Sequence, residues 1–156
     1  MSNMKIAIDA DDAAFYLKDI IYNYLKSKGH DITDLYFANG NADVTYPEIG
    51  FNLAKKIQSG EFDRGFLICG TGLGMAIIAN KVEGVYAGVC HDVYSAERLK
   101  KSNDANVLTM GARVVGSEHA KMICDAWLAS QFAGGSSAKK VEIMRKLEKD
   151  SFQCKK

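Results

Sequence analysis

The segment Ile68-Cys69-Gly70-Thr71-Gly72-Leu73-Gly74 constrains the fold of this chain more than any other. It follows the apolar run 65–68, which is typical of a buried strand, and it precedes the run 75–81, which is typical of a helix. Cys69 is therefore expected where a strand ends, beside a glycine-rich turn that opens a helix. The backbone N–H groups of such a turn favour negative charge.

A cysteine in this place can become a thiolate, and an anion that forms beside it meets donors already in place. The combination suits removal of a proton next to a carbonyl group. The turn does not match a dinucleotide fingerprint, because the third glycine of G-x-G-x-x-G falls on Met75 or Ile77, and no G-K-S/T follows as in a P-loop. The simpler interpretations are a tight connection and a small buried core residue.

Apolar runs and helical stripes alternate along the rest of the chain. Strands are expected over 5–10, 32–37, 65–68, 84–90 and 106–110. Helices are expected from the cap candidates Asp11 and Asp12 to Gly29, from Pro47 to about Gln58, over 75–81 and 94–101, from the cap candidate Ser117 through Leu128, and over about 137–149, with a polar tail that frays.

This alternation predicts an α/β fold: a three-layer αβα sandwich with a five-stranded parallel sheet. The third, fourth and fifth strands are apolar throughout, as expected when both faces of a sheet are covered. No linker or internal repeat interrupts the 156 residues, so a single domain over 1–156 is expected. The helix at about 137–149 has no strand after it and either folds back on its own subunit or packs on a partner.

The composition excludes several classes of function. A formal net charge of +1 argues against a nucleic-acid or membrane-surface binder, and no apolar run approaches the roughly 18 residues of a membrane span. The start of the chain shows no signal peptide, so reduced thiols and a cytoplasmic location are expected. The four cysteines form no C-x-x-C pair and the three histidines show no metal-ligand spacing, so neither a metal nor a cofactor is expected.

Ligands of parallel α/β sheets bind beyond the carboxyl ends of the strands. That edge should bring together acidic side chains, a thiol and an imidazole: Asp9, Asp11, Asp12, Cys69, His91 and Asp92. Arg113, after the last strand, is expected either to bind phosphate or to form a salt bridge at the edge. His91 either contacts a ligand or hydrogen-bonds a turn. Cys90 and Cys124 are expected in the core, and Cys154 is expected to be exposed.

Several motifs taken together resemble one known family. They are Cys69-Gly70-Thr71-Gly72-Leu73-Gly74, Ala79-Asn80-Lys81, Tyr94-Ser95-Ala96, Asn103-Asp104-Ala105-Asn106-Val107-Leu108, Gly111-Ala112-Arg113-Val114-Val115-Gly116, the run 120–128 and Gly134-Gly135. The ordered set is similar to the ribose-5-phosphate isomerase B / galactose-6-phosphate isomerase family over nearly the whole chain. The resemblance implies a Rossmann-like fold, a homodimer or dimer of dimers with sites at the subunit interface, and metal-free aldose–ketose isomerisation of a sugar phosphate.

The resemblance also implies residue roles. Cys69 would be the base that moves a proton between C1 and C2 through an enediolate, and Thr71 would orient the base or the substrate. The N–H groups of Gly70, Gly72 and Gly74 would hold the enediolate oxygen. The candidate substrate-binding residues are Asp11, Asp12, Tyr46, His91, Ser102 and Asn103, and the candidate phosphate ligands are Arg113 and Lys140.

The chain departs from the family pattern at positions where the family has phosphate-binding cations and at the position of the histidine that opens the sugar ring. Asp12 stands where the family has a histidine, and Ser102 stands where it has the histidine credited with opening the sugar ring. Ser136 and Lys140 correspond to two phosphate-binding arginines; Lys140 retains a point charge. A tetrose 4-phosphate cannot close a five-membered ring and needs no ring opener.

The sequence therefore leaves ribose 5-phosphate and a tetrose phosphate such as erythrulose 4-phosphate both open as substrates, and the stretch 91–98 is similar to the erythrulose-4-phosphate branch of the family. The alternative of another class is a non-catalytic sugar-phosphate-binding module or one subunit of a hetero-oligomeric galactose-6-phosphate isomerase. Both alternatives take a small sugar phosphate as their ligand.

Overall fold

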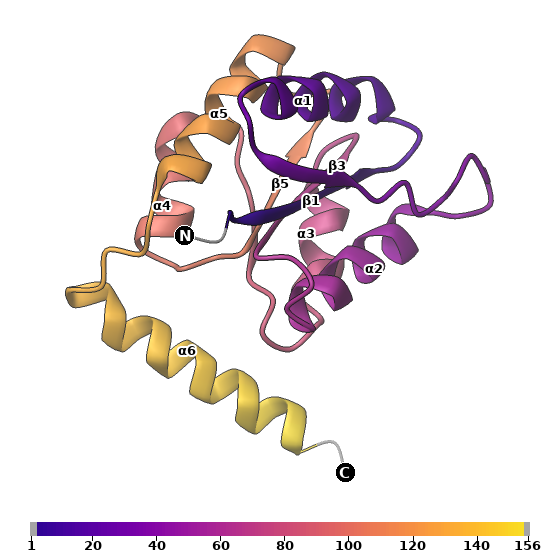
Figure 1. The fold of residues 1–156 in the computed structure, drawn as a ribbon. Coiled ribbons are helices and arrows are strands. Elements are labelled where there is room, and N and C mark those ends of the chain that lie inside the picture. Colours follow the sequence, from indigo (N-terminus) through magenta and orange to yellow (C-terminus); the bar gives the residue numbers. More distant parts are fainter. Residues whose placement is uncertain (1–2, 155–156) are drawn as a thin grey trace.

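A computed structural model describes residues 3–154 as a parallel sheet covered by helices on both faces (Figure 1). The strands are β1 (Lys5–Ala10), β2 (Asp31–Asp34), β3 (Arg64–Cys69), β4 (Ala87–Val89) and β5 (Val107–Gly111). The helices are α1 (Phe15–Ser27), α2 (Tyr46–Gln58), α3 (Leu73–Ala79), α4 (Val93–Lys101), α5 (Ser117–Ala129) and α6 (Ser136–Gln153). The predicted three-layer α/β architecture is confirmed.

The five strands are all parallel and lie in the order β2-β1-β3-β5-β4. β3 and β5 are therefore neighbours at the centre, and Cys69 at the end of β3 is paired with Gly111 at the end of β5. Every residue of β3 is buried, as its apolar sequence predicts for a strand covered on both faces. The centre of the sheet thus fixes where the glycine-rich turn begins.

Two apolar layers hold the helices against the sheet. α1, α4 and α5 cover one face, where Ile21, Ile123 and the fully buried Trp127 pack against side chains such as Phe66. α2 and α3 cover the other face. Burial of side chains of this size, at about 1.5–3 kcal/mol each, dominates the stability of both layers.

The buried Arg64 anchors the chain where it leaves α5. Its guanidinium donates to the backbone oxygens of Trp127 at 2.7 Å and Ser130 at 2.8 Å, and it lies over the Trp127 ring. Carbonyl oxygens at the end of a helix otherwise lack partners, so this buried cation satisfies them. Arg64 thereby fixes the point from which the chain continues to α6.

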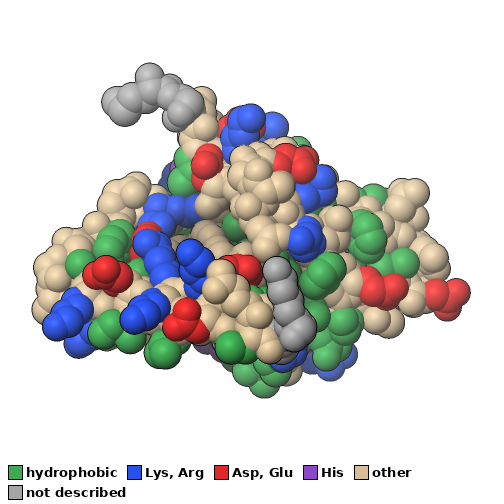
Figure 2. Space-filling view, turned by 90° about the horizontal axis from the view of Figure 1, so that it is seen from below, with side chains coloured by type: hydrophobic (Ala, Val, Ile, Leu, Met, Phe, Trp, Pro, Cys, Tyr) green, Lys and Arg blue, Asp and Glu red, His purple; other side chains and the backbone are tan. Residues whose placement is uncertain are grey.

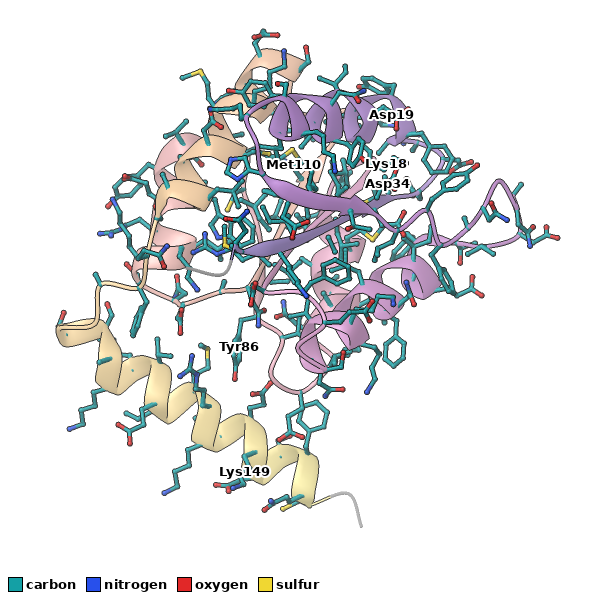
Figure 3. The ribbon with its side chains drawn as sticks, viewed as in Figure 1. Lys18, Asp19, Asp34, Tyr86, Met110 and Lys149 are labelled. Carbon is teal, nitrogen blue, oxygen red and sulfur yellow. The ribbon has the colours of Figure 1, made fainter. Side chains whose placement is uncertain are left out.

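α6 stands off the rest of the molecule as a long outer helix (Figure 1). Val141 is its one buried residue among those described. Polar contacts tie its middle to the body: the Tyr86 hydroxyl donates to Glu148, and Arg145 forms a 2.6 Å ion pair with Asp104 (Figure 3). Exposed polar ties contribute little each, so α6 is held more weakly than the five inner helices.

Several predicted boundaries were wrong. α1 begins at Phe15 with Ala14 as its N-cap, so Asp11 and Asp12 are not helix caps but lie in the turn before the helix. Gly116 rather than Ser117 is the N-cap of α5. α6 continues to Gln153, so residues 150–153 do not form the expected polar tail.

Two predicted strands are shorter than expected. β2 ends at Asp34: the N–H of Leu35 still donates to Ile8 O, but carboxylates accept the N–H groups of Tyr36 and Phe37, and Tyr36 has a φ of 43°. β4 covers only Ala87–Val89 and is half-exposed at the sheet edge, so the expectation that both its faces are covered was wrong. The chain before β4 turns between Val82 and Val85 instead of pairing with the sheet.

Candidate functional site

The floor of the candidate site forms where β3 and β5 end side by side. Beyond the paired residues the two chains continue to exchange backbone hydrogen bonds: Ala112 N–H donates to Cys69 O at 2.8 Å, and Arg113 N–H donates to Gly70 O at 3.1 Å. The glycine turn and the segment after β5 therefore form one connected unit at the carboxyl edge of the sheet. Parallel α/β proteins bind ligands at this edge.

The Cys69 side chain is 5% exposed and accepts a hydrogen bond from the N–H of Gly72, with 3.1 Å between nitrogen and sulfur. Gly72 has a φ of 78°, and a Cβ there would lie 2.8 Å from the backbone carbon of Met110. Both observations require glycine at this place. The turn thus aims a backbone donor at the sulfur.

A hollow of about 420 Å³ opens above Cys69. We call it the thiol hollow; its lining consists of Asp11, Asp12, Ala13, Tyr46, Cys69, Gly70, Thr71, Gly74 and Arg113. The turn after β1, the start of α2, the glycine turn and the segment after β5 each contribute to it. Four segments far apart in sequence therefore meet where the sequence predicted them to meet.

Two walls of the thiol hollow owe their shape to glycine. The Arg113 side chain lies against Gly70, and the Tyr46 ring lies against Gly74, where a Cβ would come within 2.5 Å of a ring carbon. The glycines thus let a cation and an aromatic ring approach the backbone closely. Tyr46 is 42% exposed, so part of its ring faces outward from the chain.

Asp11 and Asp12 also line the thiol hollow, and the charge of Arg113 partly offsets that of Asp11. Burial and the neighbouring Asp12 raise the pKa of Asp11, while the N–H of Ala13 and the charge of Arg113 act in the opposite direction. Arg113 is the one cation in the lining of the thiol hollow, among the residues described. A doubly charged phosphate would meet Arg113 favourably and Asp12 unfavourably.

His91 does not line the thiol hollow. Its Nε2 accepts a hydrogen bond from the N–H of Gly111 at 2.9 Å, which places the ring beneath the floor next to β5. Burial lowers the pKa of His91, as suits a neutral ring that accepts this bond. Of the two predicted interpretations, the structure supports the one in which His91 holds a turn.

Three predicted site residues lie elsewhere. Ser102, Asn103 and Lys140 line a second hollow of about 330 Å³ together with Ser137, Val141 and Met144, and we call it the α6 hollow. Residues 102–106 connect the end of α4 to the start of β5, so they lie at the amino edge of the sheet. The thiol hollow lies at the carboxyl edge, so one chain does not bring its two sets of residues together.

The structure corrects one detail of the predicted anion hole. Gly70 and Gly74 line the thiol hollow, but Gly72 is buried and its N–H is directed at the Cys69 sulfur. Thr71 is exposed at the rim, where its Oγ1 accepts a 3.3 Å hydrogen bond from the N–H of Leu73. Gly72 therefore acts on the thiol rather than on a substrate oxygen.

Ser137 and Met144 were not among the predicted site residues. A signal was present, because Ser137, Lys140, Val141 and Met144 follow the i, i+3, i+4, i+7 spacing of one helix face.

Within residues 3–154, no group of three or more His, Cys, Asp and Glu side chains is arranged to hold a metal ion. Within the same range, no helix is long and apolar enough to cross a membrane.

The fold and the thiol hollow define a class: an α/β protein with a thiol, backbone N–H groups and one cation at the carboxyl edge of a parallel sheet. A family model described as Ribose/Galactose Isomerase matches residues 6–144. The chain belongs to this family of isomerases, which interconvert aldose and ketose forms of sugar phosphates.

Individual relatives agree with the family model. The D-erythrulose-4-phosphate isomerase of Pectobacterium atrosepticum is 50% identical over 139 residues, which cover 89% of this chain and 91% of that protein. The ribose-5-P isomerase B of Listeria innocua is 46% identical over 145 residues, 93% of this chain and 97% of that protein. The solved ribose-5-phosphate isomerase B of Clostridium thermocellum superposes with a TM-score of 0.90 at 44% identity, covering 95% of this chain and 99% of that chain.

Proposed function

We propose that this isomerase acts on a phosphorylated sugar with Cys69 as the base. The carrying observation is that the Cys69 sulfur lies on the floor of the thiol hollow with the Gly72 N–H donating to it. In the ketose-to-aldose direction, the thiolate takes a proton from C1 and leaves an enediolate across C1 and C2. The same thiol returns a proton to C2, while the hydroxyl proton moves from O1 to O2, so that C1 becomes the aldehyde carbonyl and C2 carries the hydroxyl.

The other residues of the thiol hollow fit this chemistry. The backbone around Gly70 and Gly74 lies next to the thiol, where N–H donors can stabilise a developing oxyanion. Asp11 accepts hydrogen bonds from hydroxyl groups of the substrate, and Arg113 binds the phosphate of the substrate. Thr71 at the rim orients the substrate or the base.

The substrate that we propose is a tetrose phosphate, interconverted between erythrulose 4-phosphate and erythrose 4-phosphate. In the described part of the chain no histidine lines either hollow, and Ser102 stands where the family resemblance implies a ring-opening histidine. A substrate that cannot form a five-membered ring needs no such acid. The relative that is 50% identical is an erythrulose-4-phosphate isomerase, which supports this choice over ribose 5-phosphate.

A substrate panel tests this choice. The purified protein is assayed with erythrulose 4-phosphate, ribose 5-phosphate and galactose 6-phosphate, and kcat/KM is expected to be at least about tenfold higher for the tetrose phosphate. Higher kcat/KM for ribose 5-phosphate would reject the tetrose assignment. No turnover of any sugar phosphate by the chain alone would favour the alternative in which it is one subunit of a hetero-oligomer.

We further propose that two copies of the chain assemble so that the α6 hollow of one faces the thiol hollow of the other. Ser102, Asn103 and Lys140 would then reach the substrate that Cys69 deprotonates. Exposed apolar side chains flank both hollows: Leu73 and Ile77 on α3, and Met144 on α6, are 57%, 62% and 37% exposed. A second copy would cover these side chains.

Mixing two inactive variants tests this arrangement. Cys69→Ala impairs one half of each site and Asn103→Ala impairs the other, so each variant alone is expected to be nearly inactive. In randomly mixed dimers about half of the molecules contain both chains, and one of their two sites is intact, so about a quarter of wild-type activity is expected. No recovery after mixing would show that each site comes from a single chain.

A further inference from the structure

The buried carboxylate of Asp9, near the carboxyl end of β1, accepts hydrogen bonds from the next residue and from a loop distant in sequence. Asp9 is 1% exposed at the end of β1. One of its oxygens accepts the N–H of Ala10 at 2.8 Å, and the other accepts the N–H of Phe37 at 3.1 Å. The first bond is local, to the residue that follows Asp9 in β1. The second ties the loop that leads to Tyr46 to the end of β1, from which the Asp11 turn continues.

These two segments face each other beside the thiol hollow. A small apolar hollow of about 90 Å³ separates them, with Asp12 and Phe15 on one side and Ala38, Gly40, Asn41, Ala42, Val44 and Ile49 on the other. Asp12 lines both this hollow and the thiol hollow. The separation of the two segments therefore sets the distance between the acidic wall of the thiol hollow and the wall that Tyr46 forms.

Charged groups surround Asp9 from two neighbouring elements. Lys18 of α1 is 3% exposed, pairs with Asp34 of β2 at 2.7 Å and lies 3.5 Å from Asp19 (Figure 3). Its ammonium group also lies over the rings of Phe15 and Tyr36. The partner of Asp9 in β3 is the apolar Leu67. Lys18 attracts the Asp9 carboxylate and Asp34 repels it.

Burial dominates these opposing effects and raises the pKa of Asp9 from 3.8 to about 6. A folded-state pKa above the unfolded value means that the folded chain binds the proton more tightly. The associated stabilisation is fully present below about pH 4 and is lost as the pH rises through about 6. At neutral pH the ionised carboxylate therefore opposes folding, so stability alone does not account for an aspartate here.

We propose that Asp9 is a positioning residue for the isomerisation: its buried carboxylate joins the Asp11 turn to the Tyr46 loop and so sets the width of the thiol hollow. This role rests on the proposed function of that hollow. An ionised acceptor holds an N–H roughly twice as strongly as a neutral one, so loss of the charge loosens both segments. The substrate then meets walls that are no longer held at a fixed distance.

The test compares Asp9→Asn with Asp63→Asn. Asp63 is a matched control, because its carboxylate also accepts a backbone N–H of β1, that of Lys5 at 2.8 Å, but at the opposite end of the strand. Asp9→Asn is expected to raise KM about tenfold and to change kcat less than about threefold, since binding groups move while Cys69 stays in place. Asp63→Asn is expected to leave KM within about twofold of wild type.

Hydrogen exchange of the Phe37 amide reports on its hydrogen bond to Asp9 without any assay of activity. Its protection factor is expected to fall in Asp9→Asn but not in Asp63→Asn, at matched global stability. In the wild-type protein the same protection factor is expected to fall as the pH decreases through about 6, when Asp9 takes up its proton. This second measurement does not require the variant to fold.

Three outcomes separate the proposals. If the wild-type enzyme is active and the variants Asp9→Asn and Asp63→Asn have the same KM, the positioning role is overturned. Phe37 protection that does not change with Asp9→Asn or with pH would overturn it as well. Wild-type protein without activity on any sugar phosphate would overturn the proposed function instead. The phosphate of the substrate also titrates near pH 6, so any change of KM with pH is compared between wild type and Asp9→Asn.

Discussion

The thiol hollow and the α6 hollow are built in different ways. The floor of the thiol hollow consists of the ends of two buried central strands and a turn whose Gly72 leaves no room for a Cβ. The α6 hollow lies between the end of α4 and an outer helix whose one buried residue, among those described, is Val141. The comparison shows that the hollow in which we propose the chemistry stands on buried strands, whereas the hollow that we propose adds binding groups is held by contacts at the surface.

The surface near α6 does not change this comparison. Figure 2, which views the molecule from below, shows basic, acidic and hydrophobic side chains interspersed over this face. The ties of α6 are ion pairs and hydrogen bonds of the kind that contribute about 0–1 kcal/mol each. Substitution of the thiol itself should therefore affect kcat strongly, whereas substitutions around α6 should act on KM and stability.

The largest effect is expected for Cys69→Ala, which removes the proposed base. We expect kcat to fall about a thousandfold with little change in the unfolding midpoint, because a general base typically contributes a factor of 10² to 10⁴. Cys90→Ala is the control: Cys90 is buried outside the thiol hollow, and burial raises its pKa to about 12. Equal activity of Cys69→Ala and wild type would contradict the assignment of the base.

Lys140→Ala tests the α6 half of the site. We expect KM for the phosphorylated substrate to rise about 10–100-fold with kcat less affected, because a charge-assisted bond to phosphate is lost. Lys139→Ala removes an equal charge from an exposed neighbour that does not line the α6 hollow. The same change in KM for both variants would indicate a general electrostatic effect and not a phosphate ligand.

Gly74→Ala examines how firmly the wall of the thiol hollow is held. The added methyl group would lie 2.5 Å from a ring carbon of Tyr46, so the ring has to move. A rise in KM of about five- to tenfold is expected, with unchanged helix content, since alanine favours a helix. Gly116→Ala, which meets no atom within 4 Å, should behave like wild type. An unchanged KM in Gly74→Ala would show that Tyr46 does not contact the substrate.

Tyr86→Phe should give the smallest effect, because it removes one tie between α6 and the body. The hydroxyl of Tyr86 donates to Glu148, and its loss is expected to lower the free energy of unfolding by about 1 kcal/mol and to raise KM less than about threefold. Tyr94→Phe is the control, since Tyr94 is 71% exposed. A large fall in kcat in Tyr86→Phe would contradict the separation between a rigid chemical half and a weakly held binding half.

Sequence reasoning located the sheet and the thiol because both depend on local patterns. The apolar run that ends at Cys69 and the glycines after it fix a strand, a turn and a helix within a few residues. The same reasoning misplaced the start of α1, because Asp11 and Asp12 are good N-cap residues whose preference was overridden by the turn that places them in the thiol hollow.

Long-range contacts were beyond the sequence. Nothing in the residues near Asp9 shows that its carboxylate binds the N–H of Phe37, a residue that was expected in the second strand but lies beyond the end of β2. Likewise, the family resemblance placed Asn103 and Cys69 in one site, but in one chain they lie at opposite edges of the parallel sheet, because Asn103 precedes β5 and Cys69 ends β3. Tertiary topology decides both points.

One strand sets the geometry of both halves. β3 begins with Arg64, which pins the chain on its way to α6, and it ends with Cys69. The five steps from Arg64 to Cys69 place their Cα atoms about 17 Å apart along the strand. β3 therefore fixes how far the start of the α6 segment lies from Cys69. In the dimer that we propose, lengthening β3 by two residues would change the distance between the hollow that each subunit offers and the hollow that it receives.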